Sequence, residues 1–190
     1  MDAVSERTGW QRIARRIRVP LGFVFAVVFL SLARPTAVSL ACSLPVVVTG
    51  VWLRGYAAGY VKKNEELTRT GPYAYMRNPL YLGSMLIAFG FAGAARSVVI
   101  VLVLAVLFAV IYWPTIRSEE AFLRSEFPEF EEYARAVPRL LPRLTAAPTT
   151  ASAGVFSRGR YLHHREYNAA MGATAIYAAL AVRLLIVRHG

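Results

Sequence analysis

The first polar stretch with side chains suited to chemistry holds Tyr73, Arg77, Asn78 and Tyr81. Pro79 within it suits the first turn of a helix, because the N–H groups there have no partner inside the helix and proline lacks this group. We therefore expect aromatic rings, a fixed cation and free backbone amides around one helix start. Such a group can hold a ligand that combines a carboxylate with an aromatic base. The competing interpretation is a belt of interfacial tyrosines with Arg77 as a basic anchor.

A second polar stretch begins at Arg117 and continues with Glu119 and Glu120. It directly follows a long apolar run, where acidic side chains are costly to leave half-buried without a partner. This position favours a binding role for Glu119 more than for Glu120. The competing interpretation is a solvated helix start whose carboxylates pair with nearby arginines. Farther along, Glu131 and Glu132 are typical of a solvated helix face.

The composition predicts that both stretches belong to a membrane protein. Hydrophobic residues make up 56% of the 190 residues and charged residues only 17%, whereas ordinary soluble domains have about 25% charged residues. This apolar content excludes a disordered chain, and the single cysteine, Cys42, excludes a disulfide scaffold. The formal net charge of +11 would suggest nucleic acid in a soluble protein. Here it favours basic cytoplasmic edges on a membrane protein, with membrane lipids and no nucleic acid as partners.

Five runs without a charged residue predict the membrane spans. A helix needs about 20 residues to cross the hydrocarbon core, and the shorter runs would need flanking polar residues to reach both interfaces. We therefore expect an all-α polytopic membrane helical bundle of about five spans, with a cytoplasmic cap made of two inter-span segments. The runs cover residues 19–33, 35–53, 79–95, 97–116 and 168–182.

The distribution of basic residues predicts the orientation of the spans. Most of them lie before the first run, between the second and third, and between the fourth and fifth, whereas Arg34 and Arg96 fall on the other side. Positive residues favour the cytoplasmic side, so the polar stretches are expected to face the cytoplasm. Arg183 and Arg188 leave open that the last run is a re-entrant or surface helix. Residues 1–145 are expected to form the core with its cap, and 146–190 a linker, a basic interfacial segment and a carboxyl-terminal helix of the same domain.

The two polar stretches together resemble a known family. Gly71-Pro72-Tyr73, followed by Arg77-Asn78-Pro79-Leu80-Tyr81, resembles the Gly-x-Tyr…Arg-His-Pro-x-Tyr signature of the isoprenylcysteine carboxyl methyltransferase family. The related membrane phospholipid methyltransferases share it loosely. The acidic pair, a Phe-Pro…Tyr stretch over 127–133 and Val137-Pro138 follow in the family's order. Asn78 replaces the family histidine, and a one-residue deletion follows Phe127. The resemblance covers about residues 67 to 142.

This resemblance implies an S-adenosylmethionine-dependent methyltransferase. It places the cofactor in the cytoplasmic cap and implies a lipophilic small-molecule or lipid methyl acceptor. We add Arg77 as an electrostatic partner for the cofactor's carboxylate, and Tyr73 and Tyr81 suit the sulfonium as cation–π neighbours. Asn78 keeps a positioning role but cannot become cationic as a histidine does. The implied cofactor contacts are Glu66, Leu67, Thr68, Tyr73, Asn78, Pro79, Tyr81 and Glu119.

The nature of the acceptor decides which residues would be catalytic. A carboxylate is already ionised at neutral pH and needs a cation, for which Arg117 is the candidate. An amine must lose a proton, which favours Glu119 or Glu120 as the base. Because Arg117 adjoins the acidic pair, O-methylation of a carboxylate is favoured, and N-methylation of a phospholipid or other amine is the alternative. The sequence also leaves open a membrane reductase of the sterol-reductase type and a non-catalytic membrane protein.

The carboxyl-terminal tail contains His163, His164 and Glu166, which could suggest a metal site. Adjacent histidines point to different faces of a helix, and the sequence supplies no further ligand to complete a set. We therefore expect no metal, and interpret the segment as a basic interfacial anchor, with a lid over the acceptor site as the alternative. Gly55 and Gly59 are expected to allow close helix packing near the side from which an acceptor would enter.

Overall fold

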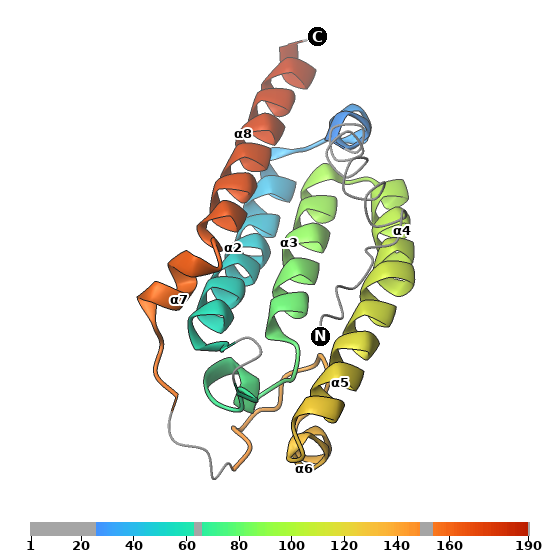
Figure 1. Cartoon of the computed structure of the whole chain (residues 1–190). Helices are drawn as coiled ribbons and strands as arrows, with labels where there is room; N and C mark the ends of the chain where they lie inside the picture. The colour runs from blue at the N-terminus through green and yellow to red at the C-terminus, as the bar shows by residue number, and fades with distance from the viewer. Residues whose placement is uncertain (1–25, 63–65, 149–153, 190) are drawn as a thin grey trace, which may run out of the picture.

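The computed structural model describes residues 26–62, 66–148 and 154–189, and within them the regular structure is helical, with no strand. This confirms the predicted all-α class. A helix covers residues 26–32, and the elements that follow appear in Figure 1. They are α2 (Ala37–Tyr60), η1 (Gly71–Ala74), α3 (Pro79–Ala95), α4 (Val98–Leu107), η2 (Phe108–Tyr112), α5 (Trp113–Glu126), α6 (Phe130–Ala136), α7 (Arg158–His163) and α8 (Tyr167–His189).

Three helices are long and apolar enough to cross a membrane: Ala37–Tyr60, the continuous helix Val98–Glu126, and Tyr167–Ile186. Pro79–Ala95 is a shorter apolar helix. The long helices turn large apolar side chains outward, as at Val98, which is 73% exposed. A lipid-facing surface has this composition. The first predicted span, 19–33, lies partly outside the described residues, so about five spans is consistent with the helices.

Local sequence signals fix the starts and ends of these helices. The hydroxyls of Thr36 and Ser39 form a reciprocal capping box at the start of α2. Arg96 adopts a left-handed backbone conformation at the end of α3, and Ser97 caps α4 through the backbone N–H of Ile100. These turns form the short connections between the helix over residues 26–32 and α2, and between α3 and α4. Helix α2 continues past its predicted end before Arg54, because a single charged residue does not terminate a helix.

The long helix Val98–Glu126 contains a π-helical turn, η2, between α4 and α5. It carries the chain without a break from the α3–α4 turn to the acidic pair. The predicted fourth span ended at Ile116, and the helix extends beyond it to Glu126. Within η2, the ring of Tyr112 lies 5.5 Å from that of Tyr81 in an edge-on arrangement.

Helices α2 and α3 pack closely through two glycines. A Cβ atom on Gly50 would lie 2.7 Å from the carbonyl oxygen of Gly83, and one on Gly83 would lie 2.8 Å from the carbonyl oxygen of Gly50. Side chains at either position would force the helices apart. The larger apolar core of the bundle includes Val47, Phe91 and Leu180.

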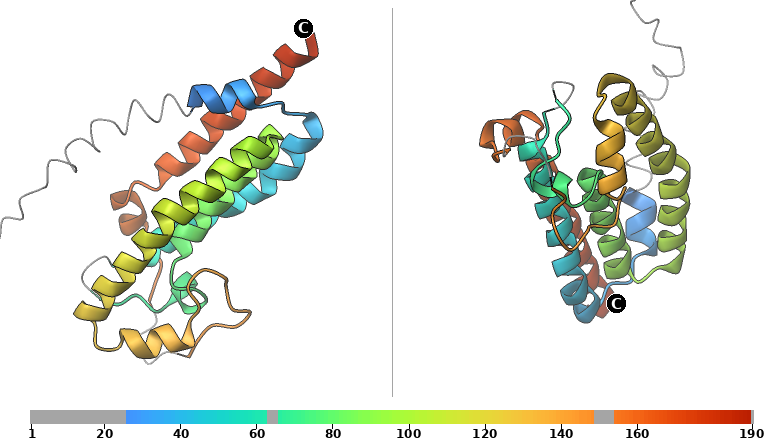
Figure 2. Two further views of the ribbon diagram at one scale, coloured as in Figure 1. Left: turned by 90° about the vertical axis from the view of Figure 1, so that its right-hand side faces the viewer. Right: turned by 90° about the horizontal axis from the view of Figure 1, so that it is seen from below.

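The polar segments gather at one end of the bundle, as both views in Figure 2 and the view in Figure 1 show. We call residues 66–78 and 127–148 the polar cap. Its two parts are joined by backbone hydrogen bonds from Arg77 N to Pro138 O at 2.9 Å, and from Ala147 N to Ala74 O at 2.9 Å. Leu67 and Phe130 pack together in its small apolar core. The cap therefore holds the starts of η1 and α3 against the segment that follows α5.

Candidate functional site

Glu120 is the centre of a buried polar cluster between α5 and the polar cap. Its side chain is 4% exposed. Asn78 Nδ2 donates a hydrogen bond to its Oε1 at 3.1 Å, and Arg139 Nη2 donates to its Oε2 at 2.8 Å. Arg77 completes the cluster, with Nη1 3.4 Å from Oε2. Buried carboxylates need such partners, since an unpaired one is costly to remove from water.

The arginines around Glu120 are themselves held in place. The Arg139 guanidinium lies over the ring of Trp113, 5.0 Å from its centroid, and hydrogen bonding to Glu120 raises the pKa of Arg139. Burial lowers the pKa of Arg77, partly offset by the charge of Glu120. Asn78 Nδ2 also donates to Arg139 O at 3.1 Å. The cluster therefore links the start of α3, the side of α5 and the segment after α6.

Glu119, the neighbour of Glu120, points elsewhere. It is exposed, and its carboxylate faces the hydroxyl of Tyr81 as a hydrogen-bonding partner. The two residues come from α5 and α3, so the two polar stretches meet here as expected from the sequence. An exposed carboxylate beside aromatic side chains is suited to binding a cationic group.

The hydroxyl of Tyr73 is buried and has no hydrogen-bond partner among the described residues. The residue is 7% exposed. Burial, together with the charges of Tyr133, Glu119 and Glu166, raises the pKa of Tyr73. The Tyr133 hydroxyl donates instead to the Tyr73 carbonyl oxygen at 2.8 Å, which fixes η1 against α6. A buried hydroxyl without a partner costs about 1–3 kcal/mol, so this position is suited to meeting a ligand.

The remaining predicted site residues do not all join this group. Leu67 is buried in the apolar core of the polar cap, and Pro79 is buried in the first turn of α3. Thr68 accepts a hydrogen bond from the backbone N–H of Lys62 at 3.2 Å, and Glu66 pairs with the Lys62 side chain at 3.0 Å. Arg117 is exposed on α5. The described contacts of these residues are therefore separate from those around Glu119.

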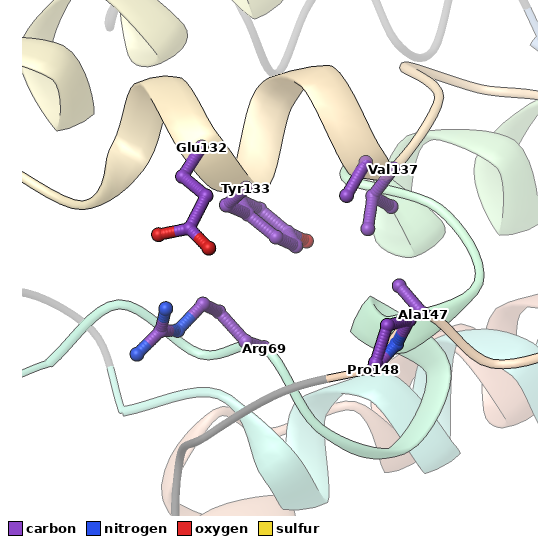
Figure 3. A pocket seen from close by; sticks show the side chains of 7 residues that line it. Arg69, Glu132, Tyr133, Val137, Ala147 and Pro148 are labelled. Carbon is purple, nitrogen blue, oxygen red and sulfur yellow. The ribbon is translucent and has the colours of Figure 1, made fainter.

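A pocket of about 250 Å³ opens between the two parts of the polar cap. Figure 3 shows Arg69 on one side, facing Glu132 and Tyr133 of α6 on the other. The Nε of Arg69 is buried and without a hydrogen-bond partner among the described residues. Glu132 was interpreted from the sequence as part of a solvated face; it is exposed and also lines this pocket.

Sequence reasoning missed two groups that the fold brings to the site. Arg139, which directly follows Val137-Pro138, was given no role, although its Nε and Nη2 donate hydrogen bonds to both carboxylate oxygens of Glu120. Arg54 and Glu166 form an ion pair at 2.9 Å, and the charges of both act on Tyr73. The position of Arg54 at the end of an apolar run could have marked it as a functional cation. Nothing local in the sequence indicated that Glu166 would be its partner. In the described ranges 26–62, 66–148 and 154–189, no cluster of three metal-ligating side chains is found.

Comparison with known proteins bears on half of the chain. It is 42% identical over 95 residues to the cobalt-zinc-cadmium resistance protein CzcN of Cupriavidus metallidurans, a match that covers 50% of this chain and 43% of that protein. It is 39% identical over 95 residues to the nickel-cobalt-cadmium resistance protein NccN of Alcaligenes xylosoxydans xylosoxydans, covering 50% of this chain and 44% of that one. The match thus spans less than half the length of these relatives.

No solved structure matches the chain. A family model does, over residues 37–129, which run from α2 to the turn before α6. This interval contains Tyr73, Asn78, Tyr81 and the acidic pair. The narrower resemblance to the isoprenylcysteine carboxyl methyltransferases stays a prediction. Residues 37–129 match the phospholipid methyltransferase family, and this match, with the apolar helices, supports a membrane methyltransferase.

Proposed function

We propose that this chain transfers the methyl group of S-adenosylmethionine to a lipophilic acceptor at the membrane surface. The observation that carries the proposal is the meeting of Glu119 with Tyr81 beside the unpartnered Tyr73 hydroxyl. These residues come from separate stretches of the family-matched interval. Such convergence of polar and aromatic side chains at the end of an apolar bundle favours a ligand site over simple helix packing.

The residues present fit S-adenosylmethionine. The exposed carboxylate of Glu119 is suited to the α-amino group, and the rings of Tyr73 and Tyr81 are suited to the sulfonium. The Nε of Arg77 is buried without a hydrogen-bond partner among the described residues, which leaves a donor for an anionic group. When bound, this cofactor supplies a methyl group on a cationic sulfur, which is a good leaving group. Glu66, Leu67, Thr68, Asn78 and Pro79 stay predicted contacts.

The protein's part in such a transfer is to orient the reactants and exclude water. A displacement needs its reacting atoms about 3–3.5 Å apart and in line. The Glu120 cluster holds the start of α3, which carries Tyr81, against α5, which carries Glu119. We therefore favour a positioning role for Glu120, because both carboxylate oxygens already accept hydrogen bonds from Arg139. Its assignment as a catalytic base stays a prediction.

The acceptor is proposed to be a carboxylate, with an amine as the second candidate. A carboxylate acceptor requires a cation, and Arg117 is exposed on α5, close in sequence to Glu119. The match to the phospholipid methyltransferase family favours the amine instead. An amine would need Glu119 as its base, since Glu119 is exposed while Glu120 is buried.

We also propose that the site faces the cytoplasm. The polar cap, the end of α2 and α7 lie at one end of the bundle, while the α3–α4 turn lies at the other (Figure 1). Arginine and lysine are more numerous in the segments at the first end. The positive-inside rule then places the polar cap in the cytoplasm.

The proposal is tested with the full chain purified in detergent. S-adenosylmethionine binding is measured by calorimetry for the wild type, Glu119→Gln and Glu131→Gln. Glu131 is the matched control, because it is an exposed carboxylate that pairs with Arg124 away from Tyr81. We expect Glu119→Gln to lose binding and Glu131→Gln to retain it. Equal affinities in all three proteins would refute the site.

Transfer of a labelled methyl group is then followed with a prenylcysteine analogue and with phosphatidylethanolamine. Methylation of the first supports the carboxylate and methylation of the second supports the amine. Binding of the cofactor without transfer to either compound or to a total lipid extract would contradict the proposed reaction.

A further inference from the structure

The ion pair between Arg54 and Glu166 lies at the edge of the candidate site. Arg54 Nε donates a hydrogen bond to Glu166 Oε2 at 2.9 Å, and Nη2 donates one to Oε1 at 2.9 Å. The guanidinium and the carboxylate are therefore joined by two parallel hydrogen bonds. The Arg54 side chain is 25% exposed and that of Glu166 is 12% exposed. A planar guanidinium in this arrangement matches any carboxylate or phosphate.

Arg54 is fixed from its other side by α3. Its Nη1 donates to the Leu80 carbonyl oxygen at 3.3 Å and to the hydroxyl of Ser84. Its stem lies over Gly83, where a Cβ atom would come within 2.6 Å of Arg54 Cγ. Leu80 precedes Tyr81, so the cation is anchored next to the aromatic side of the site. Arg54 is thus held in place without Glu166.

Glu166 comes from outside the family-matched interval and from a segment docked on α2. Arg160 Nε donates to the Gly59 carbonyl oxygen at 2.8 Å, and the Phe156 ring lies where a Gly59 Cβ would be, at 2.1 Å. Glu166 itself is in the turn between α7 and α8, next to Arg165, whose φ is +53°. Glu166 therefore lies outside both α7 and α8.

Two further features of the described residues fit an amphiphilic ligand. The buried Tyr73 hydroxyl lacks a hydrogen-bond partner among the described residues, and the charges of Arg54, Glu119 and Glu166 all act on it. A pocket of about 390 Å³ lies between α2 and the tail. It is apolar and aromatic, and is lined by Val51, Trp52, Gly55, Tyr56, Phe156 and Tyr161.

We propose that Arg54 binds the anionic group of the methyl acceptor, and that Glu166 occupies this position until an anionic amphiphile displaces it. The acceptor's carboxylate or phosphate would take over the two parallel hydrogen bonds from Arg54, and its apolar chain would run along α2 toward the aromatic pocket, which is lined by Gly55, the residue after Arg54. The Tyr73 hydroxyl would donate to the same group. The inference rests on the proposed function, because only a methyltransferase would use this amphiphile as its methyl acceptor. It adds no covalent step to methyl transfer.

The exchange is energetically reasonable because one carboxylate replaces another. Removing either partner alone would leave a partly buried charge unpaired, which is costly. Replacing Glu166 by an incoming anion avoids this cost. The ion pair therefore selects anionic amphiphiles. An uncharged amphiphile that displaced Glu166 would leave the Arg54 guanidinium without an ionic partner.

The test measures amphiphile binding to the full chain in non-ionic micelles, without S-adenosylmethionine. The probes are palmitate, dodecyl phosphate and, as the uncharged comparison, hexadecanol. Glu166→Gln keeps the size of the side chain and removes its charge, and Glu131→Gln again serves as the control. Thermal unfolding of each variant is recorded first, to confirm that it is folded.

We expect Glu166→Gln to bind the anionic probes about tenfold more tightly than the wild type, a difference of about 1.4 kcal/mol. We expect Arg54→Gln to lose the preference for anions over hexadecanol. Arg54→Lys keeps the charge but cannot form two parallel hydrogen bonds, so we expect it to retain part of this preference. Glu131→Gln should match the wild type. The anion with the larger response identifies carboxylate or phosphate as the preferred group.

A purely structural ion pair gives the opposite result. Glu166→Gln would then bind the anionic probes no better than the wild type, or less well, and this outcome would overturn the inference. An anion preference that survives in Arg54→Gln would overturn it as well. Failure of S-adenosylmethionine binding in calorimetry would instead refute the proposed function and leave the amphiphile result standing.

Discussion

The side-chain amide of Asn78 donates a hydrogen bond to Glu120 at 3.1 Å, which ties the start of α3 to the far end of the helix Val98–Glu126. The same Asn78 nitrogen reaches the carbonyl oxygen of Arg139. One neutral side chain therefore joins three segments that are distant in sequence. Its neutrality suits the place, because Glu120 already has two arginines as cationic partners.

Replacing Asn78 by aspartate should destabilise the protein more than replacing it by alanine. The aspartate would put a second carboxylate against buried Glu120, whereas alanine removes hydrogen bonds at a cost of about 1–3 kcal/mol. Thermal unfolding in detergent measures both changes. Asn168→Asp is the control, because Asn168 is exposed at the start of α8, where a negative charge is tolerated. A smaller loss in Asn78→Asp than in Asn78→Ala would contradict this account of the cluster.

Glu120→Ala should be the most damaging change of a single carboxylate in the polar cap region. It leaves Arg77 buried without its ionic partner, and breaking a buried pair costs about 3–5 kcal/mol. Because the Arg139 side chain is 32% exposed, the lower end of that range is expected. Glu132→Ala, at an exposed position on α6, should change the free energy of unfolding by less than about 0.5 kcal/mol. Equal losses in the two variants would show that the cluster does not stabilise the fold.

Gly83→Ala should destabilise the contact between α2 and α3. The new methyl group would lie 2.6 Å from Arg54 Cγ and 2.8 Å from the Gly50 carbonyl oxygen, and such overpacking costs about 1–3 kcal/mol. Gly93→Ala is the matched control on the same helix, because nothing lies within 4 Å of its added Cβ. There alanine should stabilise the helix by about 0.5–1 kcal/mol. Relative to the wild type, we expect the unfolding midpoint to fall in Gly83→Ala and to rise in Gly93→Ala.

Tyr73 should make the fold sensitive to alkali. Burial raises the pKa of Tyr73 above its ordinary value of 10.0, so the unfolded chain loses this proton before the folded one does. As the pH rises above 10, the folded state binds more protons than the unfolded state and its stability falls. Tyr73→Phe removes this contribution without removing a hydrogen bond to the hydroxyl. Unfolding in denaturant should therefore show a shallower loss of stability above pH 10 in the variant; parallel curves would argue against burial of the hydroxyl.

The main architecture could be predicted because it depends on local properties of the sequence. Charge-free runs mark the helices, and Arg96–Ser97 marks a tight hairpin. The meeting of Tyr81 with Glu119 was also predictable, since both residues lie where a span joins the same polar end. The ends of the helices were less predictable. Helix α2 runs past Arg54 because Glu166 and α3 provide partners for the charge.

Other parts of the site depend on contacts that a linear pattern does not contain. Arg139 reaches Glu120 only because the segment after α6 folds back along η1 through backbone hydrogen bonds. Glu166 reaches Arg54 only because the tail packs on the glycines of α2. The prediction that Gly55 and Gly59 permit close packing was therefore sound, and their neighbours, Tyr161 and Phe156, belong to the tail. The tail was expected to be a basic anchor, with a lid as the alternative, and both stay predictions.

The π-helical turn η2 determines the direction in which the acidic pair points. A π turn takes up one more residue than an α turn, and each residue of an α-helix rotates the following side chains by about 100°. Without that wider turn, Glu120 would swing away from Asn78 and Glu119 away from Tyr81. The orientation of the two carboxylates is thus determined several residues earlier, by the π-helical turn in the apolar part of the same helix.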